Sequence, residues 1–195
     1  LLNRIEKTRT ELEALNLQLK RFRLIDSLLY ASGKALETAV ETVFKDEWGC
    51  EVKRMPPGHT IDFKVTHPQA GVQLVIEVAG VKDKIRKGNS ELTQVLTYLN
   101  YKTPEEKIVL LTNTHRETRI DERPKENFTK EVIEIAEKNG FCLMTAWDLY
   151  RLWKDSLQSK LVDRILLSIY NTSGVYQYEQ NYAQIFSSSG CEKLP

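Results

Sequence analysis

The apolar run V-Q-L-V-I-E-V-A at residues 72–79 constrains the fold most, because it is typical of a central strand yet contains an acid. The preceding run, T-I-D-F-K-V-T at residues 60–66, alternates apolar and polar residues and contains Asp62. Between them, H-P-Q-A-G at residues 67–71 is a turn sequence, which predicts a hairpin. A carboxylate inside an apolar strand is costly to bury unless it is paired, hydrogen-bonded or bound to a cation. Asp62 and Glu77 are therefore the leading candidate site residues.

The rest of the pattern predicts a mixed β-sheet with helices on both faces. Further strands are expected over residues 50–54, 107–113 and 141–145, and helices over residues 34–44, 90–101, 129–139 and, as a pair, 147–170. Ser90 is a candidate N-cap, and Gly140 is expected to end its helix. We divide the chain into a helical stem (1–30), a main domain (31–170) and a C-terminal surface extension (171–195), which is rich in Ser, Tyr, Gln and Asn.

The stem contains neither Pro nor Gly and has a heptad seam. The seam residues are Leu1, Ile5, Thr8, Leu12, Leu15, Leu19 and Phe22. Two interpretations stay open: a helix packed on its own domain, or a coiled coil that pairs two copies or joins a preceding module. The second predicts a homodimer or a higher oligomer. Because the chain begins at Leu1 without Met, we expect it to be part of a longer protein.

Composition excludes several classes of protein. Lys and Arg total 28 against 27 Asp and Glu, a net charge of +1, so any nucleic-acid binding depends on a local patch. No apolar run approaches the roughly 20 residues that a bilayer span needs, so no membrane partner is expected. Cys50, Cys142 and Cys191 lack the spacing of a metal site, which indicates reduced thiols and a cytoplasmic protein.

The two acidic residues have two open interpretations. If the strands pair, both carboxylates approach one point, and Glu37 or Glu41 on the preceding helix can add a third oxygen ligand. Such a cluster suits Mg²⁺ or Mn²⁺ and metal-assisted hydrolysis of a phosphodiester. The alternative is that the acids form salt bridges, with Lys64, Lys53 or Lys82 as the candidate partners.

Several short motifs, in this order along the chain, resemble a known family. They are G-K-x-L-E (33–37), an Asp on one strand, I-E-V-x-G (76–80), Q-x-x-x-Y (94–98), E-R-P-x-E-N-F-T-K-E (122–131) and F-C-L-M-T (141–145). Together they resemble bacterial members of the PD-(D/E)XK nuclease superfamily over roughly residues 33–155. The resemblance implies the restriction-endonuclease-like fold, an αβββαβ core with a mixed sheet.

The resemblance also implies an activity and a site. Asp62 and Glu77 would hold Mg²⁺ or Mn²⁺, and Glu37 would bind metal or orient water. Gln94 and Tyr98 would face the site or the nucleic-acid backbone. The implied protein is a nuclease acting on DNA, the effector part of a larger bacterial defence protein. The alternatives are a catalytically dead nucleic-acid-binding or oligomerisation module and a module that binds neither metal nor nucleic acid.

The chain departs from the family at one position. The family motif places Lys two residues after the second acid, where this chain has Ala79. Either the lysine was replaced to inactivate the protein, or it was naturally lost or has migrated. The nearest substitutes are Lys64, Lys82 and Lys84, and Lys64 has the strand parity to share a face with Asp62.

A basic turn follows the second acidic strand. Its cations are Lys82, Lys84, Arg86 and Lys87, which either contact phosphates or form a solvated loop. Arg116, Arg119 and Arg123 lie among acids and are expected to form internal ion pairs.

Overall fold

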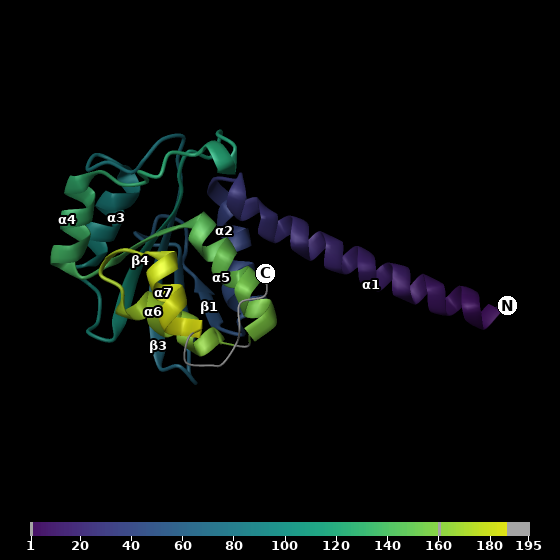
Figure 1. Ribbon diagram of the computed structural model, residues 1–195. Helices are drawn as coiled ribbons and strands as arrows, with labels where there is room; N and C mark the ends of the chain where they lie inside the picture. The colour runs from purple at the N-terminus through teal and green to yellow at the C-terminus, as the bar shows by residue number, and fades with distance from the viewer. Residues whose placement is uncertain (1, 160, 187–195) are drawn as a thin grey trace.

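The computed structural model describes residues 2–159 and 161–186, which form a six-stranded sheet with helices on both faces (Figure 1). The strands lie in the order β1 (Glu51–Arg54), β2 (Phe63–His67), β3 (Val72–Gly80), β4 (Glu106–Asn113), β5 (Cys142–Thr145) and β6 (Gly174–Val175). β1, β2 and β3 pair antiparallel, whereas β3 to β6 run parallel. The mixed α/β class is as predicted. Leu1, the first residue of the predicted heptad seam, and Cys191, one of the three cysteines, lie outside the described residues.

The expected hairpin is formed by β2 and β3, with Phe63 opposite Ile76. β2 begins three residues later than predicted from Thr60, but the backbone pairing continues past its end. The Asp62 N–H donates to the Ile76 carbonyl at 3.1 Å, and the Asp62 carbonyl accepts from the Met55 N–H at 2.8 Å. Asp62 therefore lies just before β2, bonded to the neighbours on both sides, at one end of the sheet.

Helices cover the two faces of the sheet and bury a separate apolar cluster on each. On one face lie α2 (Gly33–Thr42), α5 (Ala146–Ser159) and α6 (Val162–Asn171), and on the other lie α3 (Ser90–Tyr98) and α4 (Lys130–Asn139). Ile76 of β3 belongs to the first cluster, whereas Val75 and Ala79 belong to the second. Since successive strand residues point to opposite faces, Glu77 lies on the α3 face with Ala79.

Two predicted helix ends had different outcomes. Gly140 adopts φ +70°, the left-handed conformation that ends a helix, as predicted for α4. Ser90 is wrong as the N-cap, because it is the first helical residue and Asn89 precedes the helix. The Asn89 side chain accepts from the Arg86 N–H at 2.8 Å, so it closes the basic turn and does not cap α3.

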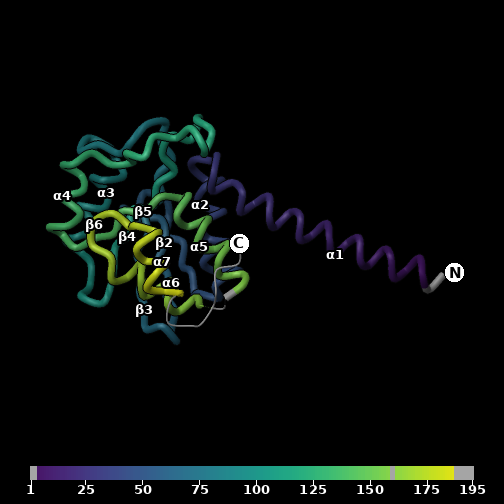
Figure 2. Tube along the Cα trace, viewed as in Figure 1, coloured from purple at the N-terminus to yellow at the C-terminus, as the bar shows by residue number. Residues whose placement is uncertain are grey.

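The stem helix α1 (Leu2–Asp26) projects from the domain along most of its length (Figures 1 and 2). Among its apolar side chains, Leu12 is 58% exposed and Leu15 is 62% exposed. Contact with the domain begins near Phe22, whose ring lies 5.9 Å from that of Trp153, and Ile25 is fully buried. The interpretation of a helix packed on its own domain is therefore wrong except for the last turns. No helix within the described ranges combines the length and apolar character needed to cross a membrane.

The segment after α6 is not a surface extension as far as residue 186. β6 adds a parallel strand beside β5, and α7 (Tyr178–Phe186) buries Ile185 and Phe186 in the first apolar cluster. Residues 187–195 lie outside the described part of the chain. Cys50 and Cys142 are free and buried, and burial raises the pKa of both thiols to about 12.

Candidate functional site

The carboxyl groups of Asp62 and Glu77 lie together at the edge of the hairpin, as the alternation of the two strands predicts. Asp62 Oδ2 accepts a 2.8 Å hydrogen bond from the backbone N–H of Val78, the residue after Glu77. The two carboxyl groups are close enough for each to affect the pKa of the other. The hairpin register and this backbone bond therefore position the acid pair.

Glu77 is the buried member of the pair. Its side chain is 4% exposed, and its Oε2 has no hydrogen-bond partner among the described residues. Burial raises the pKa of Glu77 to about 9, and the negative charges of Asp62, Glu91 and Glu37 add to the effect. Burial also raises the pKa of Asp62, although the Val78 N–H opposes the shift. Glu77 therefore holds a proton at neutral pH when no cation is present.

Glu37 lies on α2 near the acid pair, but Arg54 holds its carboxylate. Arg54, the last residue of β1, donates to Glu37 Oε2 and to Glu41 Oε2, the latter at 2.6 Å. Within the described ranges, no three His, Cys, Asp or Glu side chains are placed to hold a metal ion together. Glu37 is therefore paired with Arg54 and acts on the acid pair through its charge, and its role as a third direct ligand stays a prediction.

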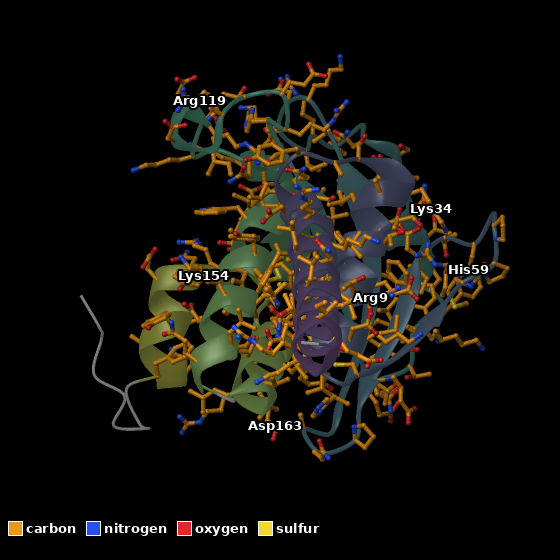
Figure 3. The ribbon with its side chains drawn as sticks, turned by 90° about the vertical axis from the view of Figure 1, so that its right-hand side faces the viewer. Arg9, Lys34, His59, Arg119, Lys154 and Asp163 are labelled. Carbon is orange, nitrogen blue, oxygen red and sulfur yellow. The ribbon has the colours of Figure 1, made fainter. Side chains whose placement is uncertain are left out.

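A pocket of about 270 Å³ opens beside Asp62. Lys34 and Glu37 of α2, Arg54 of β1 and His59 of the following loop line it. Figure 3 shows Lys34 and His59 on the same side of the domain, at the right of that view. Asp62 thus faces a solvent-accessible hollow, while Glu77 lies behind it in the sheet.

Ala79 is 1% exposed and packs among apolar residues on the α3 face, opposite Thr112 in the sheet. Gln94 is half-buried on α3, one turn from Glu91, whose charge acts on Glu77. Residues three apart share a helix face, so Gln94 lies on the side of α3 nearest the acid pair. The role that the resemblance implies for Gln94 stays a prediction.

Lys64 is not available to the acid pair. Its Nζ lies 2.5 Å from Glu106 Oε1, and this hydrogen bond raises the pKa of Lys64. The Tyr98 hydroxyl donates to the other Glu106 oxygen at 3.1 Å, and Tyr98 is only 4% exposed. Tyr98 is therefore part of an internal network, and the expectation that it contacts nucleic acid is wrong for this conformation.

The basic turn is an exposed loop whose cations are mostly paired with acids. Lys82 lies 3.0 Å from Glu117, and Lys84 lies 2.8 Å from Glu126. Arg86 pairs with Asp83, and Lys87 is exposed. The salt bridges proposed from Lys64 and Lys82 to the acid pair are therefore wrong. Exposed pairs of this kind contribute little free energy, and contact of this turn with phosphates stays a prediction.

The arginine-rich loop follows the prediction only in part. Arg119 pairs with Asp121 at 3.2 Å, as expected. Arg123 instead donates to Asn113 Oδ1 at 3.1 Å and to the Leu29 carbonyl at the base of the stem. This loop therefore connects the end of β4 to the stem.

A second contact joins the stem base to the sheet. Asn113 Nδ2 donates to the Ala31 carbonyl at 2.9 Å, and Ser32 lies directly against Gly80 at the end of β3. A Cβ on Gly80 would lie 2.5 Å from the Cβ of Ser32, so only glycine fits there. The acid-bearing strand thus ends against the residue that precedes α2.

Two residues of the site were missed from the sequence. Arg54 lies 17 positions after Glu37, and no motif in the sequence marks it. Its strand pairing with Phe63 brings it beside Asp62 and Glu37. Lys34 lies within the quoted G-K-x-L-E motif, and its spacing of three from Glu37 was the available signal.

Comparison with known proteins adds no assignment. No protein-family model matches the chain, and no curated protein matches it. Among solved structures, the chain is similar to protein VC1899 from Vibrio cholerae, with 14% identity and a TM-score of 0.39. The match covers 75% of this chain and 43% of the Vibrio cholerae protein, so this chain spans less than half of the length of that protein.

Proposed function

We propose that this chain contains a divalent-metal-dependent nuclease domain that hydrolyses phosphodiester bonds in DNA, with Asp62 and Glu77 as metal ligands. The observation that carries the proposal is the buried Glu77 Oε2, which has no partner among the described residues and lies in a carboxyl group beside Asp62. A buried acid next to a second acid is unfavourable without a cation. Such an arrangement is typical of functional sites.

The residues present fit Mg²⁺ or Mn²⁺. Both ions prefer carboxylate oxygens, and Mg²⁺ takes one or two protein carboxylates while it keeps several waters. Asp62 and Glu77 supply this number, while Glu37, paired with Arg54, adds its negative charge near them. When bound, the ion would polarise the phosphate and lower the pKa of a water molecule.

The protein's own contribution is to fix these groups before substrate binds. The Val78 N–H fixes Asp62, the strand buries Glu77, and Arg54 fixes Glu37. Preorganised charges of this kind need little rearrangement during reaction. Exposed Lys82 and Lys87 of the turn after β3 are candidate contacts to the DNA backbone.

A second candidate function is a nucleic-acid-binding module without catalysis. Ala79 favours this second function. The position is buried and uncharged, whereas the PD-(D/E)XK family that the chain resembles has Lys there. The two candidates make different predictions for cleavage but the same prediction for DNA retention.

Titration with Mn²⁺ in a calorimeter, together with a plasmid-nicking assay in Mg²⁺, Mn²⁺ or EDTA, tests the proposal. Asp62→Asn and Glu77→Gln should each weaken Mn²⁺ binding and abolish any cleavage, whereas Glu134→Gln, an exposed carboxyl on α4, should change neither. Equal Mn²⁺ binding by all variants would exclude the metal site. DNA retention without cleavage at any metal concentration would favour the binding module.

We also propose that the stem pairs with the stem of a second copy. The heptad seam of α1 is exposed, with Ile5 58% and Leu19 47% accessible. A projecting helix gains little stability without packing, and an identical seam has the matching spacing of three and four.

A further inference from the structure

The pocket beside Asp62 is lined by two cations of the described chain, Lys34 and Arg54. Arg54 is already engaged, because its two terminal nitrogens donate to Glu37 and Glu41 and its guanidinium lies 4.8 Å from the centre of the Phe63 ring. An arginine held on three sides has little freedom to turn toward a ligand.

Lys34 has a different environment. Its Nζ lies 3.6 Å from Glu37 Oε2, which is longer than a good hydrogen bond, and its side chain is 73% exposed. An exposed pair at this distance is weak, so an anion in the pocket can draw the ammonium away from Glu37. Lys34 is also the second residue of α2, in the first turn, where the N–H groups favour negative charge.

Three other candidate lysines have shorter contacts with acids. Lys64 is held by Glu106 on the sheet, Lys82 by Glu117, and Lys84 by Glu126. None of these three lines the pocket beside Asp62, whereas Lys34 does.

We infer that Lys34 binds a phosphate of the nucleic-acid backbone in the pocket beside Asp62. This inference rests on the proposed function and assigns to an α2 side chain the positive charge that Ala79 does not supply. The weak contact with Glu37 leaves the ammonium at the pocket, where a phosphate can replace the carboxylate as its partner. The substrate class is a phosphodiester chain. It would approach the domain from the side where Lys34 and His59 lie (Figure 3).

The test measures the affinity of the full chain for fluorescein-labelled single-stranded and duplex DNA by anisotropy, in EDTA and in Mn²⁺, over a range of salt. The variants are Lys34→Ala and Lys34→Arg, and the control is Lys154→Ala, an exposed lysine on the opposite side of the domain (Figure 3). Loss of a charged phosphate contact should weaken binding about tenfold. It should also lower the slope of log affinity against log salt by about 1. Lys34→Arg should keep most of the affinity.

Two further measurements separate this inference from the proposed function. The affinity for Mn²⁺ and the melting temperature of Lys34→Ala should equal those of the unmodified chain, because Lys34 is not a metal ligand or a core residue. If Lys34→Ala binds DNA with the same affinity and salt slope as Lys154→Ala, the inference is wrong. A loss of Mn²⁺ affinity in Lys34→Ala would also overturn it, since the residue would then act by positioning Glu37. Failure of the proposed function would instead appear as unchanged Mn²⁺ binding in Asp62→Asn.

Discussion

The carboxylate of Asp62 is fixed by the backbone of Val78, whose N–H donates to it at 2.8 Å. Because Val78 follows Glu77 in β3, one strand both carries the buried acid and positions its partner. The distance between the two carboxyl groups therefore depends on hairpin register and not on flexible side-chain packing. A slip of one residue in the hairpin would move Glu77 to the other face of the sheet.

The first prediction concerns pH. Burial raises the pKa of Glu77 from its ordinary 4.5 to about 9, so the folded state keeps a proton that the unfolded state releases. The free energy of unfolding without metal should therefore fall as pH rises from about 4.5 to about 9. Glu77→Gln removes this dependence and should be more stable than the unmodified chain by at least about 1 kcal/mol at pH 8, with little difference at pH 4. Urea unfolding in EDTA at several pH values measures this, and Glu134→Gln serves as control. If the free energy of unfolding of Glu77→Gln changed with pH in the same way as that of the unmodified chain, the prediction would be wrong.

The second prediction concerns position 79. Glu77 and residue 79 share the α3 face, so Lys at position 79 would place an ammonium beside the acid pair. Ala79→Lys should raise Mg²⁺-dependent cleavage by about 10²–10³, the effect of one preorganised charge. The control is Ala79→Met, which adds similar bulk to this buried position without charge. Plasmid nicking measures the rates, with circular dichroism to confirm folding. Equal rates for folded Lys and Met variants would show that the charge at this position has no catalytic role.

The third prediction concerns Lys64, which we expect to stabilise the fold and not to take part in cleavage. Lys64→Met leaves the Glu106 carboxylate, whose side chain is 5% exposed, without its cation. This should lower the free energy of unfolding by about 1–3 kcal/mol. Adding Glu106→Gln to Lys64→Met should recover part of the loss, because the buried charge is then absent. If Lys64→Met abolishes cleavage by an otherwise active and folded chain, Lys64 is the migrated lysine after all.

The fourth prediction concerns assembly through the stem. Replacing Leu12 and Leu15, which are 58% and 62% exposed, with Ser should convert a dimer to a monomer with little change in the stability of the domain. The physical reason is that these exposed side chains do not pack on their own domain and, in the proposed pairing, would contact a second copy. Light scattering at tens of micromolar measures the mass. The control is Thr10→Ser on another face of the helix, and a monomeric unmodified chain would contradict the proposal.

Local patterns predicted the hairpin and the approach of Asp62 to Glu77, because strand alternation and the turn sequence specify both, although His67 belongs to β2 and the turn is residues 68–71. They did not predict that Arg54 holds Glu37 or that Glu106 holds Lys64. These pairs are 17 and 42 positions apart, and only the tertiary fold selects one charged partner from many. The strand and helix after Asn171 were missed for a related reason. Their polar composition gives weak periodicity, and the burial of Ile185 comes from the surface already formed by α6.

The close contact between Ser32 and Gly80 has a mechanical consequence. Ser32 lies against the end of β3 with no room for a side chain, and Ala31 is bonded to Asn113 of β4, so the segment that follows the stem is anchored to both strands. At 1.5 Å per residue, the 25 residues of α1 make a lever of about 37 Å. A twist or tilt applied at the far end of α1 would act on the end of β3 at Gly80, three residues from Glu77.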